Sequence, residues 1–279
     1  MTPPGLNRIR TLELIAWDID HYVCRPEPID DTRQTKAQET VVRRQVDPSA
    51  SALCDDETQL LRETLDLQKS RHDLQSEMHG LVWSLGVVDL RRLLAFQRRL
   101  SFDVTLPPLT IPAQSDWCSL INTSFAAPDP VICDMVHDSE KKTVTLQSTN
   151  PNVQLRVMQD AAMPVAVSAG SPFFEVAQYQ GRWFLRDGYH RAYNLLRAGI
   201  YRLPTVIVHA RTLEELGAVH PRFFSEQTLF SQHPPFVTDF LNESLTIEYH
   251  RHPIIKTLRI TMEETFTFPL PITTSGEIV

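Results

Sequence analysis

Apolar and polar positions alternate most clearly in the second half of the chain, where they predict a closely spaced group of elements. SPFFEVAQY, the turn residues Gln180 and Gly181, and RWFLR predict a β-hairpin. HRAYNLLRAG then places apolar residues at i, i+3, i+4 and i+7, the spacing of one buried helix face, and Gly199 is placed to end the helix. RLPTVIV, residues 202–208, predicts an apolar strand. The predicted order is therefore strand, strand, helix, strand.

The first hundred residues are expected to be mainly helical. Residues 26–58 are polar and rich in Pro, Asp, Thr and Gln, so we expect a linker there. Residues 56–79 contain no Pro or Gly and carry leucines at roughly helical spacing, which predicts an amphipathic helix. We expect a helical N-terminal region over 1–100 and an α+β domain over 101–279. A second helix is expected over 88–100, with four arginines mainly on its solvent face: Arg91, Arg92, Arg98 and Arg99.

The rest of the chain is expected to combine irregular segments with strands. Residues 105–130 are Pro-rich and are expected to be irregular. KKTVTLQS and NVQLRVM, residues 141–148 and 152–158, read as strands, while LTIEYH and TLRITMEETFTF alternate cleanly and predict a C-terminal hairpin. The predicted fold class is α+β, with a core near 150–210 and a β-rich C-terminal extension.

Composition narrows the classes of function. The 279 residues are 42% hydrophobic and 22% charged, as in ordinary globular proteins. No apolar run is long enough to span a bilayer and no signal peptide is visible, so we expect a cytoplasmic protein without membrane contact. The four cysteines lack CxxC spacing, which favours reduced thiols over a zinc site. The net charge of −7 argues against a general nucleic-acid binder, which needs a basic surface.

Positive charge is nevertheless concentrated in residues 181–211, which carry six Arg, no Lys and one Asp. The planar guanidinium fork suits phosphate and carboxylate groups. Most of these arginines are expected to be solvated surface charges. Those beside the turn at Asp187 and Gly188 are the ones to which we attach a functional interpretation.

This turn predicts a phosphate site. Backbone N–H groups at a helix N-terminus lack intrahelical partners, so that end of a helix attracts anions. Gly188 lets the backbone approach a ligand, Arg191 offers a bidentate donor, and His190 offers a donor of tunable charge. Tyr189 and Asn194 are placed with the ligand contacts.

Asp187 does not suit a bare anion site, because its charge would repel the anion. Three roles fit it: a helix N-cap, a partner for Arg191, or a ligand for Mg²⁺ carried on the phosphates. The alternative for the whole group is a capped helix with a local ion pair and no ligand. Tyr193, Trp183 and Phe184 are expected to pack in the core.

The segment GRWFLRDGYHRAYNLLRAGIYRLPTVIV resembles the core of the ParB/sulfiredoxin-like superfamily. The match lies in the hairpin, the DGYHR turn, the Ala/Leu-rich helix ending at AGI, and the following LPTVIV strand. It covers residues from about 171 to 208. The resemblance implies that the turn and helix N-terminus bind the phosphates of a nucleotide through Gly188, His190 and Arg191. From the free-serine kinase members it implies a catalytic or metal-related role for Asp187, with Glu175 as a candidate upstream acid. His190 is placed with Asp187 as a catalytic candidate.

Departures from the family restrict the function. Sulfiredoxins carry a Cys before the His-Arg pair, and Tyr189 stands there, so sulfinic-acid repair is excluded. No helix-turn-helix pattern follows Val208, so DNA partitioning is disfavoured. We expect binding of a nucleotide or another phosphorylated ligand, with Mg²⁺ as a companion ion and with phosphoryl transfer or hydrolysis as an extension. A non-catalytic protein-interaction module using the flanking regions and a nuclease-like protein remain as alternatives, and whether the protein is an enzyme stays open.

Two other groups contain the residue types that bind metals. In each group an ordinary polar surface is favoured over a metal site, and no G-x-S-x-G, Walker-type or HExxH pattern appears in the chain. The first group is Glu248, His250 and His252, which would share one face of a strand. The second group is Asp18, Asp20 and His21, which lie within four positions of the sequence.

Overall fold

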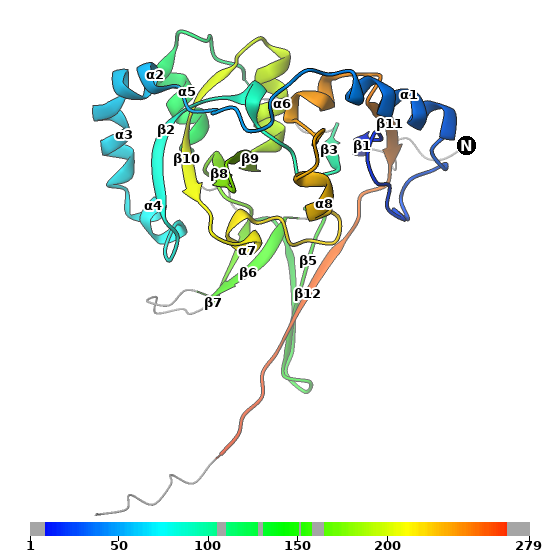
Figure 1. Cartoon of the computed structure of the whole chain (residues 1–279). Helices are drawn as coiled ribbons and strands as arrows, with labels where there is room; N and C mark the ends of the chain where they lie inside the picture. Colours follow the sequence, from blue (N-terminus) through cyan, green and yellow to red (C-terminus); the bar gives the residue numbers. More distant parts are fainter. Residues whose placement is uncertain (1–8, 105–109, 128–130, 151, 158–164, 267–279) are drawn as a thin grey trace, which may run out of the picture. The chain divides into compact units, whose positions relative to one another are not determined.

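The structure, a computed structural model, describes residues 9–104, 110–127, 131–150, 152–157 and 165–266. It is an α+β fold, as predicted, and divides into two compact units (Figure 1). The division differs from the expected boundary near residue 100, because the first strand pairs with strands from later segments. No helix in the described ranges is long and apolar enough to cross a membrane. The first unit comprises Met1–Pro130 and Gly170–Pro253, and the second comprises Val131–Ala169 and Ile254–Val279.

A four-stranded sheet forms the centre of the first unit. The predicted hairpin and the following strand are confirmed: β8 and β9 pair antiparallel, and β10 lies parallel to β8. Gln180 and Gly181 both have positive φ, 48° and 74°, which matches the twist of a tight hairpin turn. In sheet order the strands are β2 (Trp83–Asp89), β10 (Arg202–His209), β8 (Glu175–Tyr179) and β9 (Arg182–Asp187).

Helix α6 (Tyr189–Arg197) connects β9 to β10 and is the helix that the sequence predicts. Ala192, Leu195 and Leu196 are buried on its inner face. Gly199 has a φ of +77° just beyond the last turn, where a left-handed residue ends a helix. The helix buries its apolar stripe in the core, and His190 and Arg197 of α6 are exposed.

A second, three-stranded sheet of the same unit has β1 (Ile9–Leu14) between β11 (Thr246–Arg251) and β3 (Arg99–Asp103). Both pairings are antiparallel. Alternation puts Arg10 and Leu12 on one face of β1 and Glu13 on the other.

The segment expected as a linker, 26–58, contains α1 (Asp31–Val42), so that prediction is wrong over these residues. The Asp30 carboxylate caps the helix by accepting from the N–H groups of Thr32 and Arg33. Only Ala37 and Val41 of α1 are buried, which explains why its polar sequence resembles a linker.

Three short helices replace the single helix predicted over 56–79. Ser70 ends the second of them, and its hydroxyl donates to the Leu67 carbonyl, a local bond that competes with helix continuation. The helices are α2 (Asp55–Leu60), α3 (Arg62–Lys69) and α4 (His72–Glu77).

The helix predicted over 88–100 is wrong. Strand β2 continues to Asp89, a 3-10 turn η1 (Leu90–Arg92) follows, and the chain is then extended toward β3. Backbone bonds from Leu94 to Trp183 and Leu185 hold this extended form. Arg98 and Arg99 are also not on a solvent face: their side chains are 7% and 8% exposed.

The remaining helices are short. Helix α5 lies within residues 105–130, which were expected to be irregular, so that prediction is wrong over the helix. The bounds are α5 (Trp117–Ser124), α7 (Leu213–Leu216), α8 (Glu226–Leu229) and the 3-10 helix η2 (Val237–Leu241).

The second unit contains two small antiparallel sheets, and the strands predicted over 141–148 and 152–158 are confirmed. The prediction of a C-terminal hairpin is wrong, because β11 pairs with β1 whereas β12 pairs with β5. One sheet is β12 (Lys256–Thr261), β5 (Thr143–Ser148) and β4 (Asp134–Asp138); the other is β6 (Val153–Val157) and β7 (Val165–Ala169).

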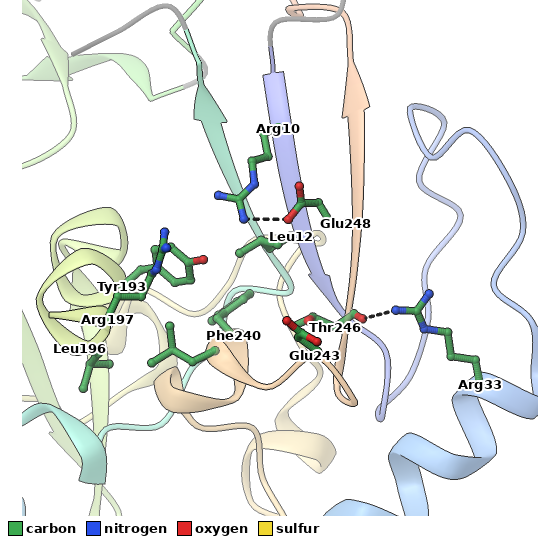
Figure 2. A pocket seen from close by; sticks show the side chains of 11 residues that line it. Arg10, Leu12, Arg33, Tyr193, Leu196, Arg197, Phe240, Glu243, Thr246 and Glu248 are labelled. Carbon is green, nitrogen blue, oxygen red and sulfur yellow. Dashed lines mark hydrogen bonds and ion pairs between the residues drawn. The ribbon is translucent and has the colours of Figure 1, made fainter. Parts of the chain in front are cut away.

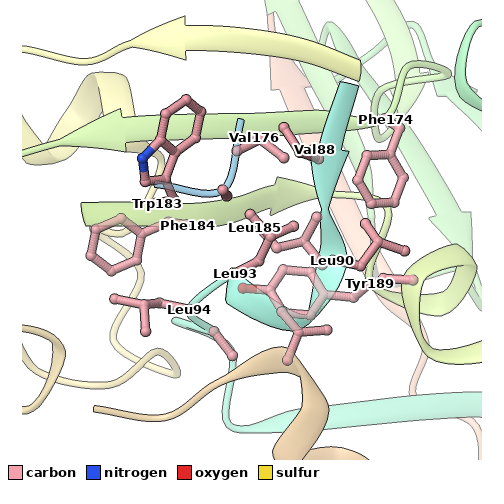
Figure 3. Close-up of a cluster of buried hydrophobic side chains, with 14 of the residues drawn as sticks. Val88, Leu90, Leu93, Leu94, Phe174, Val176, Trp183, Phe184, Leu185 and Tyr189 are labelled. Atoms are coloured by element: carbon pink, nitrogen blue, oxygen red, sulfur yellow. The ribbon is translucent and has the colours of Figure 1, made fainter. Parts of the chain in front are cut away.

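The core of the first unit packs the hairpin against the segment after β2. Trp183 and Phe184 are buried in it, as expected, and Phe174 and Tyr189 lie near the start of α6 (Figure 3). This core fixes the position of the turn at 187–191.

Candidate functional site

The predicted turn begins at Asp187, the last residue of β9, and Gly188 is the N-cap of α6. Gly188 has a φ of +98°, which side-chain-bearing residues rarely adopt. A Cβ on Gly188 would lie 2.6 Å from Cδ2 of Phe174. The close approach that this glycine permits is therefore that of Phe174 in the core.

Arg191 is hydrogen bonded to the main chain of neighbouring segments. Its guanidinium donates to the carbonyl oxygens of Thr123, Pro172 and Phe173, at 3.1, 2.7 and 2.7 Å. The charge lies 5.7 Å from the Phe174 ring centre. Arg191 therefore ties the start of α6 to the end of α5 and to the entry of β8.

The Asp187 carboxylate accepts a hydrogen bond from the N–H of Ser171 at 3.2 Å. Burial raises the pKa of Asp187, and this effect outweighs the opposing influence of the Ser171 N–H and of Arg191. The N-cap role falls to Gly188, which has no side chain to cap with.

Tyr189 and Asn194 are also engaged within the protein. Tyr189 is only 3% exposed, and its hydroxyl accepts from the N–H of Phe96 at 3.0 Å. Burial raises the pKa of Tyr189. Asn194 donates through Nδ2 to the carbonyl of His190, at 2.9 Å, one turn earlier in the helix.

His190 is the exposed residue of the turn. Its Nε2 lies 2.9 Å from the carbonyl oxygen of Ser101, so Nε2 carries a proton and donates. Its ring packs edge-on against Phe102, with ring centres 4.9 Å apart. The structure thus brings the predicted residues together, but it joins most of them to the protein itself, and their contact with a ligand stays a prediction.

Glu175 lies beside this turn. It is opposite Asp187 in the register of β8 and β9, is buried, and forms an ion pair with Arg186. Burial raises the pKa of Glu175 more than Arg186 lowers it. Its Oε1 has no hydrogen-bond partner among the described residues. Two carboxylates and one arginine therefore share a desolvated position below the helix start.

An opening lies along the C-terminal half of α6. We name it the α6 cleft, a space of about 590 Å³ between the helix and the three-stranded sheet. Figure 2 shows Tyr193 and Arg197 of α6 across from Arg10 of β1 and Glu248 of β11. The residues that line it are Arg10, Leu12, Arg33, Tyr193, Leu196, Arg197, Phe240, Leu241, Glu243, Thr246 and Glu248.

Three arginines from three elements face the α6 cleft. Arg10 donates to Glu248 at 2.7 Å, and this contact lowers the pKa of Glu248 and raises that of Arg10. Arg33 donates to the carbonyl oxygen of Thr246 at 2.8 Å. Arg197 lies 5.6 Å from the Tyr193 ring centre and forms no ion pair within the described part of the chain.

The sequence indicated only part of this cleft. Arg197 belongs to the arginine-rich segment that drew attention, whereas Arg10 and Arg33 come from regions with no functional pattern. They line the same cleft as Arg197 because β1 pairs with β11 and because Arg33 of α1 donates to Thr246 of β11.

The metal-type groups found in the sequence have other contacts. Asp18 pairs with Arg98, Asp20 pairs with Arg99, and Glu248 pairs with Arg10. Among the described residues no three His, Cys, Asp or Glu side chains come together as a metal site.

The sequence matches no protein-family model, and no curated protein or solved structure matches it either.

Proposed function

We propose that the protein binds a phosphorylated small molecule, with a nucleotide as the leading candidate, in the α6 cleft. The observation that carries the proposal is Arg197, which faces the cleft without a carboxylate partner in the described residues. Arg33 uses one donor on a backbone carbonyl and likewise has no carboxylate partner in the described ranges. The lining holds three arginines and two glutamates, so it is net positive and favours an anionic ligand even in a chain of net charge −7.

The size and lining of the cleft agree with this ligand class. Its volume of about 590 Å³ is within the range of small-molecule sites. Tyr193 and Phe240 border the cleft with buried aromatic side chains, and the arginines provide donors for phosphate oxygens. Glu243 forms no ion pair within the described part of the chain, so its carboxylate is the natural oxygen ligand for Mg²⁺ carried by the phosphates.

The cleft adjoins the predicted turn through packed rings. Phe102 lies 5.1 Å from Tyr193 and 4.9 Å from His190, measured between ring centres. Along these contacts, two aromatic residues, Tyr193 and Phe102, lie between a ligand in the cleft and His190. The proposal is limited to binding, because Asp187, the candidate for phosphoryl chemistry, is desolvated and bonded to the Ser171 N–H.

A thermal-shift panel tests the proposal. The ligands are ATP, ADP, CTP, GTP and inorganic phosphate, each with and without Mg²⁺. A ligand at one hundred times its Kd adds about 2.7 kcal/mol to stability. In a domain of this size that raises the Tm by about 5–11 °C.

Two variants locate the site. Arg197→Ala is expected to abolish the shift, whereas Arg222→Ala, a matched exposed arginine outside the cleft, is expected to keep it. The proposal is contradicted if no ligand raises the Tm of the wild-type protein, or if the rise in Tm persists in Arg197→Ala. If the rise in Tm is lost only in Arg191→Ala, the ligand binds at the turn of residues 187–191 rather than in the α6 cleft.

A further inference from the structure

Three polar side chains on neighbouring strands of the four-stranded sheet form a hydrogen-bonded row. Ser84 lies on β2, His209 ends β10, and Gln178 lies on β8, strands that are adjacent in the order β2-β10-β8. Ser84 Oγ lies 2.9 Å from His209 Nε2, and His209 Nδ1 lies 3.2 Å from Gln178 Oε1. We call these residues the serine–histidine row.

The row defines which nitrogen of His209 carries the proton. Gln178 Oε1 is an amide oxygen that only accepts, so Nδ1 donates to it. In the neutral ring Nε2 then has a lone pair and accepts from the Ser84 hydroxyl. This is the protonation state in which a histidine removes the proton of a serine nucleophile.

Ser84 also borders a groove. The groove has a volume of about 480 Å³ and is lined by Ser84 and Leu85 of β2 together with residues of α2 and α3. Figure 1 shows α2 and α3 beside β2. Ser84 is half-buried, so it joins the histidine and also meets a space large enough for a small ligand.

The lining of the groove indicates what it accepts. Leu65 and Leu85 give it an apolar part, Arg62 and Lys69 give it two cations, and three aspartates give it carboxylates that disfavour an anionic substrate: Asp55, Asp56 and Asp66. The Lys69 ammonium lies 5.7 Å from the ring centre of Trp83, the residue before Ser84. Lys69 also lines the groove, and a cation in the lining can stabilise the oxyanion that develops when a serine attacks a carbonyl. The groove therefore suits a carboxylic ester with a small apolar acyl group.

We propose that Ser84 is a nucleophile, that His209 is its general base, and that this groove hydrolyses carboxylic esters. Ser84 Oγ bonds to the ester carbonyl carbon and His209 Nε2 takes the hydroxyl proton. The ester C–O bond breaks, and His209 gives that proton to the departing alcohol. Water then adds to the acyl-serine, its proton passes through His209 to Ser84 Oγ, and the carboxylic acid leaves. Water is the one co-reactant.

The row has no local sequence signal. Ser84, His209 and Gln178 are separated by 125 and 31 positions, and Ser84 is not in a G-x-S-x-G pattern. Antiparallel pairing of β2 with β10 and parallel pairing of β10 with β8 bring them together. Gln178 is a positioning residue, because it touches His209 and not the reacting atoms.

A biotin-linked alkyl fluorophosphonate tests the nucleophile on the full chain. Ser84 Oγ bonds to phosphorus, fluoride leaves, and His209 accepts the proton. Mass spectrometry of the digested protein then locates the adduct. We expect one adduct, on Ser84, which is absent in Ser84→Ala and unchanged in Ser76→Ala, an exposed serine of α4.

His209→Ala is expected to slow labelling by about 100-fold or more, the usual contribution of a general base. Arg222→Ala should label at the wild-type rate, because Arg222 is exposed and lines neither this groove nor the α6 cleft. The proposal is overturned if the wild-type protein gives no adduct, if the adduct lies on another residue, or if His209→Ala labels as fast as the wild type.

Turnover of p-nitrophenyl acetate tests the positioning role. Gln178→Ala is expected to lower kcat with little change in KM, and Gln178→Glu is expected to restore kcat, because its carboxylate also accepts from Nδ1. An unchanged kcat in Gln178→Ala would remove Gln178 from the mechanism. Absence of any turnover beyond that of Ser84→Ala would overturn the hydrolase activity.

Discussion

Gly188 lies so close to the ring of Phe174 that a Cβ on it would come within 2.6 Å of Phe174 Cδ2. The same glycine has a φ of +98° and connects β9 to α6. One position therefore meets two independent demands, a left-handed backbone and an absent side chain.

Gly188→Ala is expected to lower the free energy of unfolding by about 2–4 kcal/mol, since a strained backbone adds to overpacking against the ring. Gly181→Ala is the matched control, because Gly181 has a φ of +74° but nothing within 4 Å of its Cβ position. It should show the backbone strain alone. Urea unfolding measures both, and an equal loss in the two variants would contradict the role of Phe174.

Arg191→Ala is expected to destabilise the protein by about 2–4 kcal/mol, because three carbonyl oxygens lose a charged donor. Arg197→Ala on the same helix should change stability by less than about 0.5 kcal/mol, since Arg197 is exposed. The measurement is urea unfolding of both variants. If Arg191→Ala kept full stability and lost phosphate affinity, the arginine would serve a ligand rather than the fold.

Tyr189→Phe is expected to cost about 1–2 kcal/mol, because the buried N–H of Phe96 loses its acceptor while the ring packing is retained. Thermal unfolding measures the loss. Tyr201→Phe serves as the control, because the Tyr201 side chain is partly exposed and its ring contact with Arg91 does not depend on the hydroxyl. A Tyr189→Phe protein as stable as this control would show that the Phe96 N–H finds another partner.

Glu248 gives a pH dependence of known sign. Arg10 holds its pKa below the ordinary value of 4.5, so the unfolded chain binds the proton more readily. The stability from this pair is therefore present above pH 4.5 and is lost as the pH falls through the folded pKa. Relative to the wild type, Glu248→Gln should be slightly less stable at pH 7, by under about 1 kcal/mol, and equally stable near pH 3. Urea unfolding across this range checks the sign.

The same substitution is expected to strengthen phosphate binding in the α6 cleft. Glu248 competes for Arg10 at 2.7 Å and adds negative charge where the ligand would lie. Removing that charge should lower the Kd several-fold, as measured by calorimetry with the ligand found in the thermal-shift panel. An unchanged or raised Kd would place the phosphates away from Arg10.

The local pattern of apolar and polar residues was sufficient to predict β8, β9, α6 and β10. The apolar residues that each of these elements buries recur at the spacing, or form the short run, that is typical of its helix or strand. It failed over 88–100, where apolar residues at helical spacing are held extended by backbone bonds to Trp183 and Leu185. The partners of Leu94 lie about ninety positions away, so no window of sequence contains them. Arg98 and Arg99 were misassigned for the same reason, since Asp18 and Asp20 are 80 and 79 positions distant.

Part of the candidate site could likewise be predicted from local sequence and part could not. The sequence identified the turn at Asp187–Gly188 and the start of α6, and the structure places both there. It did not reveal that Phe174 fills the space at Gly188. Nor did it reveal that the Arg191 guanidinium donates to backbone carbonyl oxygens. Those contacts depend on packing. The α6 cleft was missed because Arg10, Arg33 and Arg197 come to line one cleft only through the pairing of strands that are distant in the sequence.

Strand β1 is the central strand of its sheet, yet its neighbour β11 is made much later during synthesis. Glu13 and Tyr249, which are hydrogen bonded across these strands, are 236 positions apart. At translation rates of about 5–20 residues per second, β1 waits between about 10 and 50 s for this partner. Both of its edges carry unpaired backbone groups until β3 and then β11 arrive. A nascent chain therefore leaves an edge of β1 unpaired until residues 246–251 are made, and a protein-folding chaperone that shields residues 9–14 should raise the yield of folded protein.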